Sequence, residues 1–415
     1  MNKLKNFNIN KVNLIICFII PLLIWGPFFP DLIVSISALF FLYHVFKNKS
    51  FYYFLNKPMI FFFIFCLYCI FSSVFIAERT ILSLESSLFY FRIGVFSCFI
   101  WYLIDKNSAI LNYFYYTIIT CFLVLMADGF FQYFNEVNIV GFPLAGTRVT
   151  SFFGDEYIMG SYLVRLFPLL FALFLVKQKS NIEIYFLGII FILVDILVYI
   201  SGERTAFFLL NLSTIFIIIL INKYQRFRLI IFIISLACIT VLSLNSSQLT
   251  KRMLFEPLEY FSFDKNSSKE RYIFTPTHDS LIRTAYNMFK DKPILGHGPK
   301  MFRIKCKDQK YAEGSAPCMT HPHNFYLQLL SETGILGSLF LFGILFYVFH
   351  TFLRQFKSII FREKRPLSDY QVCLLAGILI TVWPLTTNGN FFNNWLMIAY
   401  SLPVGFYLQS IYSEK

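Results

Sequence analysis

Long apolar runs alternate with short polar segments along almost the whole chain. Residues 57–78 and 182–200 carry little charge, and each is close to the roughly 20 residues that an α-helix needs to cross a bilayer. Such runs recur and predict about twelve spans: 12–29, 31–46, 57–76, 88–104, 109–134, 157–176, 182–200, 204–221, 229–246, 325–350, 369–386 and 392–411. The fold class expected from this pattern is an all-α, polytopic membrane protein.

One long polar segment interrupts the pattern between the ninth and tenth spans. It divides the chain into spans 1–9 within residues 1–246, a large loop at 247–324, and spans 10–12 within residues 325–415. Hydrophobic residues make up 57% of the chain and charged residues 14%, which is too little charge to cover a soluble protein of this length. The basic N-terminus precedes an apolar stretch without a small-residue cleavage site, so we interpret it as an uncleaved first span.

Lysine and arginine are distributed unequally between the two sides of the predicted bundle. Eighteen of them lie on the side that holds both termini, whereas the short loops of the other side hold only Arg79, Arg148 and Arg204. Cytoplasmic loops are enriched in Lys and Arg, so both termini are expected in the cytoplasm and the large loop outside it. The net charge of +13 is therefore mainly a topology signal, and we predict no nucleic-acid partner.

The large loop is basic although topology does not require it to be. It holds 13 Lys and Arg against 8 Asp and Glu, a balance that suits an anionic lipid headgroup or a pyrophosphate at the membrane surface. The sequence has no G-x-x-x-x-G-K-[ST] motif and no cytoplasmic segment long enough for a nucleotide-binding domain. These features argue against ATP-driven transport and an internal sugar-nucleotide site, and no cofactor is expected.

Two histidines close the large loop in the sequence THPHN at 320–324. Histidine titrates near neutral pH, so it can take a proton from a hydroxyl nucleophile. Asn324 is placed to cap the tenth span, which would fix His323 at the membrane surface. Two alternatives stay open: an interfacial histidine pair without a role, and a metal site formed by Cys318, His321 and His323.

Polar residues also line one face at the start of the tenth span. Asn324, Gln328 and Glu332 recur at intervals of four, which places them on the same side of a helix. A carboxylate within a membrane helix is costly unless it faces a partner or a wet cavity, so Glu332 is a functional candidate; the alternative is an interfacial position. Gly334 and Gly337 follow and would allow close helix approach.

Three arginines of the predicted outer side are candidates for binding phosphate, because a guanidinium forms paired hydrogen bonds with phosphate oxygens. Arg204 lies in the turn SGERT, next to Glu203, and Arg148 lies in an outward loop. Arg283 lies on the polar face of an amphipathic helix that we expect to rest on the membrane and to end at Pro293. For Arg204 the alternative is a side chain that snorkels to the interface, for Arg148 it is a simple loop charge, and for Arg283 it is a solvated surface arginine.

Cys306 and Cys318 enclose an 11-residue polar segment in what should be an oxidising compartment. A disulfide that closes so short a loop would stabilise the fold by roughly 3 kcal/mol. We favour this bridge over two free thiols. The other seven cysteines lie in apolar runs and are expected to be inert.

The end of the loop and the start of the tenth span share a specific pattern. HN at 323–324 is followed by nine residues and then by GILG at 334–337. The stretch 283–302 begins with arginine and ends in a Pro and a Gly-x-Gly-Pro turn, and SGERT lies at 201–205. Together these segments resemble the O-antigen ligase and O-antigen polymerase superfamily, and the ligases most closely. The first five spans share only their hydropathy with it.

The resemblance implies a metal-independent glycosyltransferase with a GT-C-like fold, whose donor is a glycan on undecaprenyl pyrophosphate. Carried over by position, His323 would be the general base that deprotonates an acceptor sugar hydroxyl. Arg204 and Arg283 would bind the donor pyrophosphate and stabilise the leaving charge, with Arg148 as a further basic group. The pattern favours His323 over His321 as the base.

Glu203 departs from the resemblance, since the family often has a small residue there. We expect its carboxylate to pair with Arg204 and to weaken the hold of that arginine on phosphate. His323 is therefore the stronger site prediction.

Several functions stay open, because the related enzymes differ mainly in the acceptor. The ligase moves the glycan onto lipid A–core in lipopolysaccharide biosynthesis, the polymerase adds it to another lipid-linked glycan, and further relatives glycosylate protein. A non-enzyme alternative is a lipid-linked glycan flippase, which should carry charge along a central cavity through many spans. Charge within the predicted spans is sparse, which favours an enzyme. The resemblance implies that this enzyme lies in the bacterial inner membrane with its active site on the periplasmic face.

Overall fold

The computed structural model describes residues 9–176, 180–261 and 274–413. Part of the predicted large loop, residues 262–273, lies outside the described residues. The α-helices are α1 (Ile9–Cys17), α2 (Ile19–Trp25), α3 (Phe28–Asn48), α4 (Lys57–Phe75), α5 (Thr80–Ser87), α6 (Phe91–Lys106), α7 (Ile110–Asn135), α8 (Met159–Leu175), α9 (Asn181–Ile200), α10 (Arg204–Leu220), α11 (Gln225–Asn245), α12 (Ser247–Thr250), α13 (Glu256–Phe261), α14 (Pro276–Asp291), α15 (Phe302–Lys305), α16 (Phe325–Ile360), α17 (Asp369–Val382) and α18 (Asn394–Tyr412). A π-helical turn, Lys251–Phe255, joins α12 to α13.

Many of these helices are apolar enough for a membrane. Within the described residues, seven are also long enough to cross it: α3, α4, α5 together with α6, α7, α9, α11 and α16. Shorter apolar helices are formed by α1 with α2, by α8, by α10 and by α17. Every predicted span overlaps one of these helices or α18, although α16 continues to Ile360. The chain is therefore a polytopic helical membrane protein.

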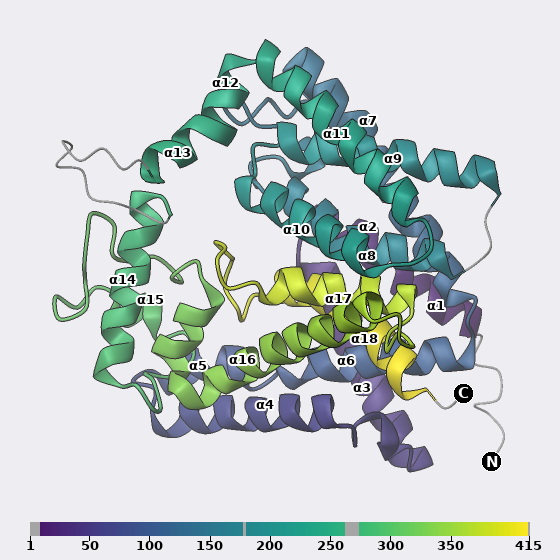
Figure 1. Cartoon of the computed structure of the whole chain (residues 1–415). Helices are drawn as coiled ribbons and strands as arrows, with labels where there is room; N and C mark the ends of the chain where they lie inside the picture. The colour runs from purple at the N-terminus through teal and green to yellow at the C-terminus, as the bar shows by residue number, and fades with distance from the viewer. Residues whose placement is uncertain (1–8, 177–179, 262–273, 414–415) are drawn as a thin grey trace.

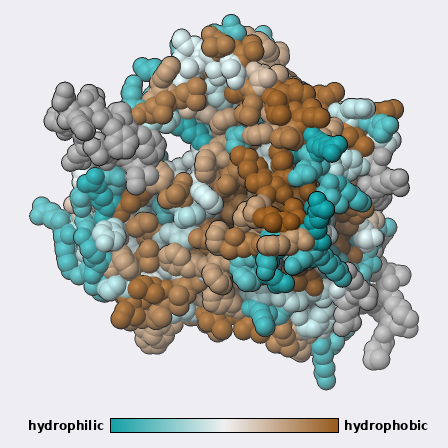
Figure 2. Space-filling model, in the orientation of Figure 1, coloured by the Kyte–Doolittle hydropathy of each residue, from teal (hydrophilic) through white to brown (hydrophobic). Residues whose placement is uncertain are grey.

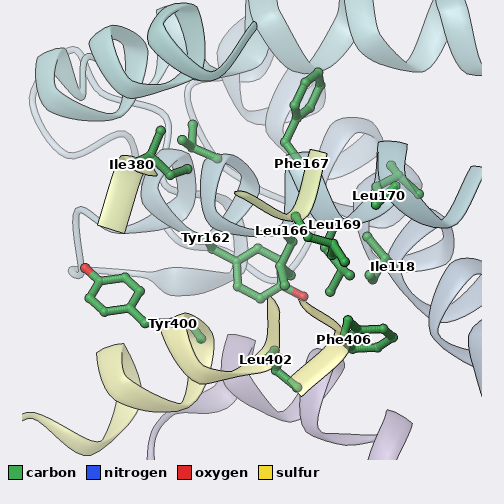
Figure 3. Packing of buried hydrophobic residues seen from close by; sticks show 14 of the residues in the cluster. Ile118, Tyr162, Leu166, Phe167, Leu169, Leu170, Ile380, Tyr400, Leu402 and Phe406 are labelled. Carbon is green, nitrogen blue, oxygen red and sulfur yellow. The ribbon is translucent and has the colours of Figure 1, made fainter. Parts of the chain in front are cut away.

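Helix α8 forms the centre of the bundle and is buried along almost its whole length. Its Tyr162 and Phe167 pack among apolar side chains that include Ile380 of α17 and Phe406 of α18 (Figure 3). Helices from both halves of the sequence thus surround α8. This position fixes the one arginine of α8, Arg165, whose Nη1 donates to the Ile380 carbonyl at 2.6 Å.

Charged side chains within the helices find partners inside the protein. Arg92 lies 2.6 Å from Asp31, and the buried Arg228 lies 3.9 Å from the buried Asp195. Arg165 packs over the ring of Tyr400 at 4.3 Å in addition to its carbonyl bond. Lipid supplies no such partners, so an uncompensated charge in this region would be costly.

Residues 274–324 form a compact polar lobe beside the bundle, which contains α14 and α15 (Figure 1). Hydrophilic side chains gather over these two helices, whereas hydrophobic ones dominate the middle of the same face (Figure 2). The lobe has a small core of its own, made of Leu281, Ala285, Met288, Phe302, Cys306 and Tyr311. The prediction that the apolar face of α14 rests on the membrane is therefore wrong, because that face is buried in this core.

The lobe is attached to α16 at an interruption of that helix. Gly334 has a φ of 64° and a ψ of −167°, so the helix is broken there. The Ile335 N–H is thereby free to donate to the Pro293 carbonyl at 2.8 Å, and the Gly298 N–H donates to the Glu332 carbonyl at 2.7 Å. Gly334 therefore admits the backbone of the lobe, whereas we had expected it to allow the approach of a second helix.

Replacing Gly334 with alanine should destabilise the protein strongly. The positive φ alone costs a non-glycine residue about 1–3 kcal/mol, and the new Cβ would lie 2.2 Å from the Ile294 carbonyl oxygen. We expect the midpoint of thermal unfolding of the purified protein to fall by several degrees. Gly377→Ala in α17 is the matched control, since its Cβ would meet Pro403 at an ordinary 3.5 Å. Equal midpoints for the two variants would contradict the role assigned to Gly334.

Candidate active site

A large cavity lies between the polar lobe and the helix bundle. Its volume is about 1680 Å³, and α10 and α13 approach it from one side while α14 and α15 approach it from another (Figure 1). Its charged and histidine side chains are Arg148, Glu156, Arg165, Glu203, Arg204, Arg252, Glu256, His278, Arg303, His321 and His323. The structure thus brings together four of the predicted site residues: Arg148, Arg204, His321 and His323.

Three histidine rings meet on the lobe side of this cavity. The ring centroid of His323 lies 4.0 Å from that of His321 and 5.0 Å from that of His278, which comes from the first turn of α14. His323 has a φ of 55°, and its carbonyl accepts a hydrogen bond from the Asn388 N–H at 2.7 Å. The loop between α17 and α18 therefore holds His323 in place.

Burial keeps these imidazoles neutral. Desolvation lowers the pKa of His323 to about 4 and that of His321 to about 3, and it also lowers the pKa of His278. The neighbouring imidazoles lower the first two values further. A neutral imidazole has one ring nitrogen that can accept a proton, so His323 can act as a base at neutral pH.

Three arginines, Arg148, Arg204 and Arg252, form a cluster on the bundle side of the cavity. The Arg204 Nε–H donates to the Arg252 carbonyl at 2.8 Å, and the Arg252 Nε–H donates to the Gly202 carbonyl at 3.0 Å. The Arg148 Nε–H donates to the Ser201 carbonyl at 3.2 Å. Carbonyls of the SGERT turn therefore orient Arg148 and Arg252, and a carbonyl of the π-helical turn orients Arg204.

Local geometry keeps this cluster tight and cationic. Gly202 has a φ of 66°, and a Cβ there would lie 2.7 Å from Arg252 Nε, so only glycine fits the turn. The Arg148 guanidinium packs over the Tyr157 ring at 3.9 Å. Burial lowers the pKa of Arg148 to about 10, which still leaves it protonated at neutral pH.

Glu203 does not pair with Arg204, contrary to our expectation. Its buried carboxylate accepts hydrogen bonds from the Gly160 N–H at 2.6 Å and the Ser161 N–H at 3.0 Å. These groups belong to the first turn of α8, where the helix dipole favours an acidic partner. Arg204 forms an ion pair with Glu256 of α13 instead.

Arg283 is not among the residues that line the cavity. Its Nε–H donates to Asp279 at 2.5 Å, and its Nη1 lies 3.4 Å from the Glu313 carboxylate. Both partners belong to the polar lobe. The structure does not bring Arg283 together with Arg204, and its part in binding pyrophosphate stays a prediction.

One face of α16 carries Asn324, Gln328 and Glu332, as predicted. These residues do not line the cavity but hold the segments that form its walls. Asn324 caps the helix with its side-chain oxygen. The Gln328 Nε2 donates to Asn390 Oδ1 at 2.8 Å, and the buried Glu332 accepts from the Phe302 N–H at 3.0 Å. Each of the three therefore supports a neighbouring loop.

Cys306 and Cys318 are joined by a disulfide bond in the polar lobe, with their Cα atoms 4.9 Å apart. A bonded sulfur is not a thiolate ligand, so Cys318 does not complete a metal site with His321 and His323. The residues that the structure describes contain no group of three or more His, Cys, Asp or Glu placed to hold a metal ion.

Four basic residues of the cavity were not predicted as site residues: Arg165, Arg252, His278 and Arg303. Arg165 comes from a membrane helix, where a charge is itself a functional signal. The other three are scattered along the polar loop, where spacing in the sequence does not tell which side chains meet.

Comparison with known proteins shows what part of this chain is similar to them. Residues 186–342 match the family described as O-antigen ligase. A curated protein of Rickettsia typhi (strain ATCC VR-144 / Wilmington), named "Putative polysaccharide ligase", is 26% identical over 253 residues. The match covers 57% of this chain and 61% of that protein, so the chain spans about three fifths of the length of the curated relative it matches.

The matched segment contains the SGERT turn, the described part of the polar loop, both histidines of THPHN and the first turns of α16. These parts supply most of the charged lining of the cavity. The chain is thus a polytopic membrane protein whose residues 186–342 are similar to the O-antigen ligase family.

Proposed function

We propose that this protein is a glycosyltransferase that moves a glycan from undecaprenyl pyrophosphate onto lipid A–core in lipopolysaccharide biosynthesis. The observation that carries this proposal is the cavity, in which neutral, half-buried histidines and a cluster of arginines line one space. Transfer from an activated pyrophosphate mainly needs positioning, a base and cations near the leaving group. The match of residues 186–342 to the O-antigen ligase family and the name of the relative support the ligase over the polymerase.

In the proposed reaction, His323 takes the proton of the acceptor hydroxyl while the hydroxyl oxygen bonds to the anomeric carbon of the donor glycan. The bond from that carbon to the pyrophosphate oxygen breaks, and undecaprenyl pyrophosphate leaves with the electron pair. Arg204 and Arg148 bind the leaving phosphates, with Arg252 in the same cluster. These arginines supply the positive charge, so the step needs no metal ion. Arg283 would join them only by leaving its ion pair with Asp279.

We further propose twelve spans in a GT-C-like arrangement, with both termini in the cytoplasm and the loop 247–324 in the periplasm. The charge asymmetry of the short loops supports this topology. In addition, α1 and the end of α18 lie on the side of the bundle away from α14 and α15 (Figure 1). A donor in the outer leaflet of the inner membrane would then reach the cavity beside the polar lobe.

Deletion of the gene tests the proposed function and separates ligase from polymerase. Without a ligase, long glycan polymer should accumulate on undecaprenyl carriers, because the step that removes it is missing. Without a polymerase, single repeats or lipid A–core capped by one repeat should appear. We expect long polymer, measured by mass spectrometry of the lipid-linked glycans and reversed by a plasmid copy. Unchanged lipid-linked glycans and lipopolysaccharide would contradict both functions.

Replacing His323 with alanine should lower the rate of glycan transfer by about 100-fold or more, the usual contribution of a general base. The pKa of His323 is about 4, and the base works only when neutral. We therefore expect kcat/KM for the donor, which reports the free protein, to be level above about pH 6 and to fall below about pH 5.

His350→Ala is the matched control, since His350 lies in α16 and stacks on Phe346 outside the cavity. Both variants are compared at equal amounts of inserted protein. Full activity of the His323 variant, or a decline of kcat/KM for the donor that begins near pH 7 in the natural protein, would count against the assigned base.

Glu256 should compete with the donor, because its carboxylate occupies Arg204 in the structure. Replacing it with glutamine removes this competition, and we expect the KM for the lipid-linked donor to fall by about fivefold, which corresponds to the roughly 1 kcal/mol of a partly exposed ion pair. Glu259→Gln on the same helix, outside the cavity lining, is the control. A higher KM in the Glu256 variant would mean that Glu256 positions Arg204 rather than competing for it.

A further inference from the structure

Three polar atoms on the walls of the cavity have no hydrogen-bond partner among the described residues. They are Arg303 Nε, His321 Nε2 and Asn388 Oδ1, and all three are shielded from solvent. The residues that carry them all line the cavity. A buried polar atom without a partner is costly, so three such atoms at one cavity point to a ligand that completes them.

Arg303 lies in α15, a short helix that is anchored on two sides. The Phe302 N–H donates to the buried Glu332 carboxylate at 3.0 Å, and Lys305 forms an ion pair with Glu78. The cavity side of the helix therefore keeps a fixed position. A cation held in this way is prepared to receive an anion without reorganisation.

His321 lies near Arg303 on the lobe side. Burial, the neighbouring His323 and the charge of Arg303 lower the pKa of His321, whereas a hydrogen bond with the backbone of Asn388 acts in the opposite direction. Thr320 Oγ1 lies 2.9 Å from His321 Nδ1. When this hydroxyl donates, the ring carries its hydrogen on Nε2, which becomes a second donor beside the Arg303 guanidinium.

Asn388 contributes an acceptor. Its Nδ2 donates to Thr386 Oγ1 at 3.2 Å, which leaves Oδ1 to accept. Its backbone N–H donates to the His323 carbonyl at 2.7 Å, so Asn388 lies directly beside the proposed base. Two donors and one acceptor complement an oxyanion that has a hydroxyl group next to it.

This oxyanion belongs to the acceptor rather than the donor. The proposed donor carries a single pyrophosphate, and the arginine cluster on the bundle side is placed to bind it. Arg303 comes from a different element, on the lobe side of the cavity. A second anionic group in the same cavity is therefore a group of the other substrate.

We propose that Arg303, His321 and Asn388 form an acceptor subsite for a sugar that carries a phosphate or a carboxylate next to its hydroxyls. The oxyanion accepts hydrogen bonds from Arg303 and His321, a hydroxyl donates to Asn388, and the reacting hydroxyl reaches His323. Arg303 thereby determines specificity for an anionic acceptor. This inference rests on the proposed function, and it adds the chemical class of the acceptor.

A binding experiment tests the subsite without any need for transfer activity. The full-length protein in lipid nanodiscs is titrated with glucose, glucose 6-phosphate and glucuronate, and binding is followed by saturation-transfer NMR. At least one anionic sugar should bind ten times more tightly than glucose, and Arg303→Gln should remove that difference. Arg303→Lys should retain part of it, and Lys307→Gln, which removes an exposed charge just beyond α15 and outside the cavity lining, should retain all of it.

Competition with inorganic pyrophosphate separates the two sources of the oxyanion. If the subsite serves the acceptor, pyrophosphate and the anionic sugar should bind independently, and Arg303→Gln should leave the affinity for pyrophosphate unchanged. Mutual displacement, together with weaker pyrophosphate binding by the variant, would assign Arg303 to the donor and overturn the inference. Equal binding of all three sugars would also overturn it.

A transfer assay gives the functional counterpart. The acceptor is rough lipopolysaccharide from cells that lack the gene, used intact or after removal of its phosphates with hydrofluoric acid. Arg303→Gln should raise the KM for the intact acceptor at least tenfold and leave the KM for the donor unchanged. An unchanged acceptor KM with normal transfer overturns the subsite alone, whereas anionic-sugar binding without any transfer overturns the proposed function alone.

Discussion

The cavity depends on the first three turns of α16, where a buried polar face holds two separate loops in place. Asn324 donates to the Pro384 carbonyl at 2.8 Å, and Gln328 binds Asn390 at the same distance, so the loop between α17 and α18 is fixed at both ends. One turn later Glu332 binds the backbone of α15. A carboxylate in this position is stable only when fully hydrogen-bonded. The costly group within the membrane helix thus serves to join the lobe to the bundle.

The arginine cluster follows from the same requirement that buried polar groups find partners. The turn after α9 presents its carbonyls to Arg148 and Arg252, because Gly202 adopts a conformation that other residues avoid. Glu203 satisfies the first N–H groups of α8 and therefore does not neutralise Arg204. That N-terminus would otherwise be an anion site itself. Within this turn the acidic group completes a helix, while the basic groups remain directed to the cavity.

Hydropathy predicted the helices well, because a segment in lipid must satisfy its backbone internally and so must be helical. The position of Asn324, the face that it shares with Glu332, and the histidines at one site also followed from local spacing. Contacts between segments that are far apart in the sequence could not be predicted from local spacing. Arg228 lies just before the predicted span 229–246, yet it is buried against Asp195, 33 positions earlier in the chain.

The sequence pattern also could not predict how the polar loop folds. The amphipathic pattern of α14 correctly indicated one buried face, but it could not tell a lipid surface from the core formed with Phe302 and Tyr311. Arg303 and His278 lack a motif, and their place in the cavity depends on how the lobe folds. Charges in such a loop interact through tertiary structure, which spacing does not encode.

Burial gives His323, the proposed base, an unusually low pKa before any substrate is bound. With a pKa of about 4, free His323 is reliably neutral but weakly basic, and a base is most effective when its pKa is near the working pH. In the proposed reaction, the arginine cluster binds a pyrophosphate that brings several negative charges into the same cavity, and nearby negative charge stabilises an imidazolium. We therefore expect the bound donor to raise the pKa of His323 toward neutrality, so that the base gains strength only when the leaving group is in place. An acceptor oxyanion at Arg303 would act in the same direction, which couples proton removal to the presence of both substrates.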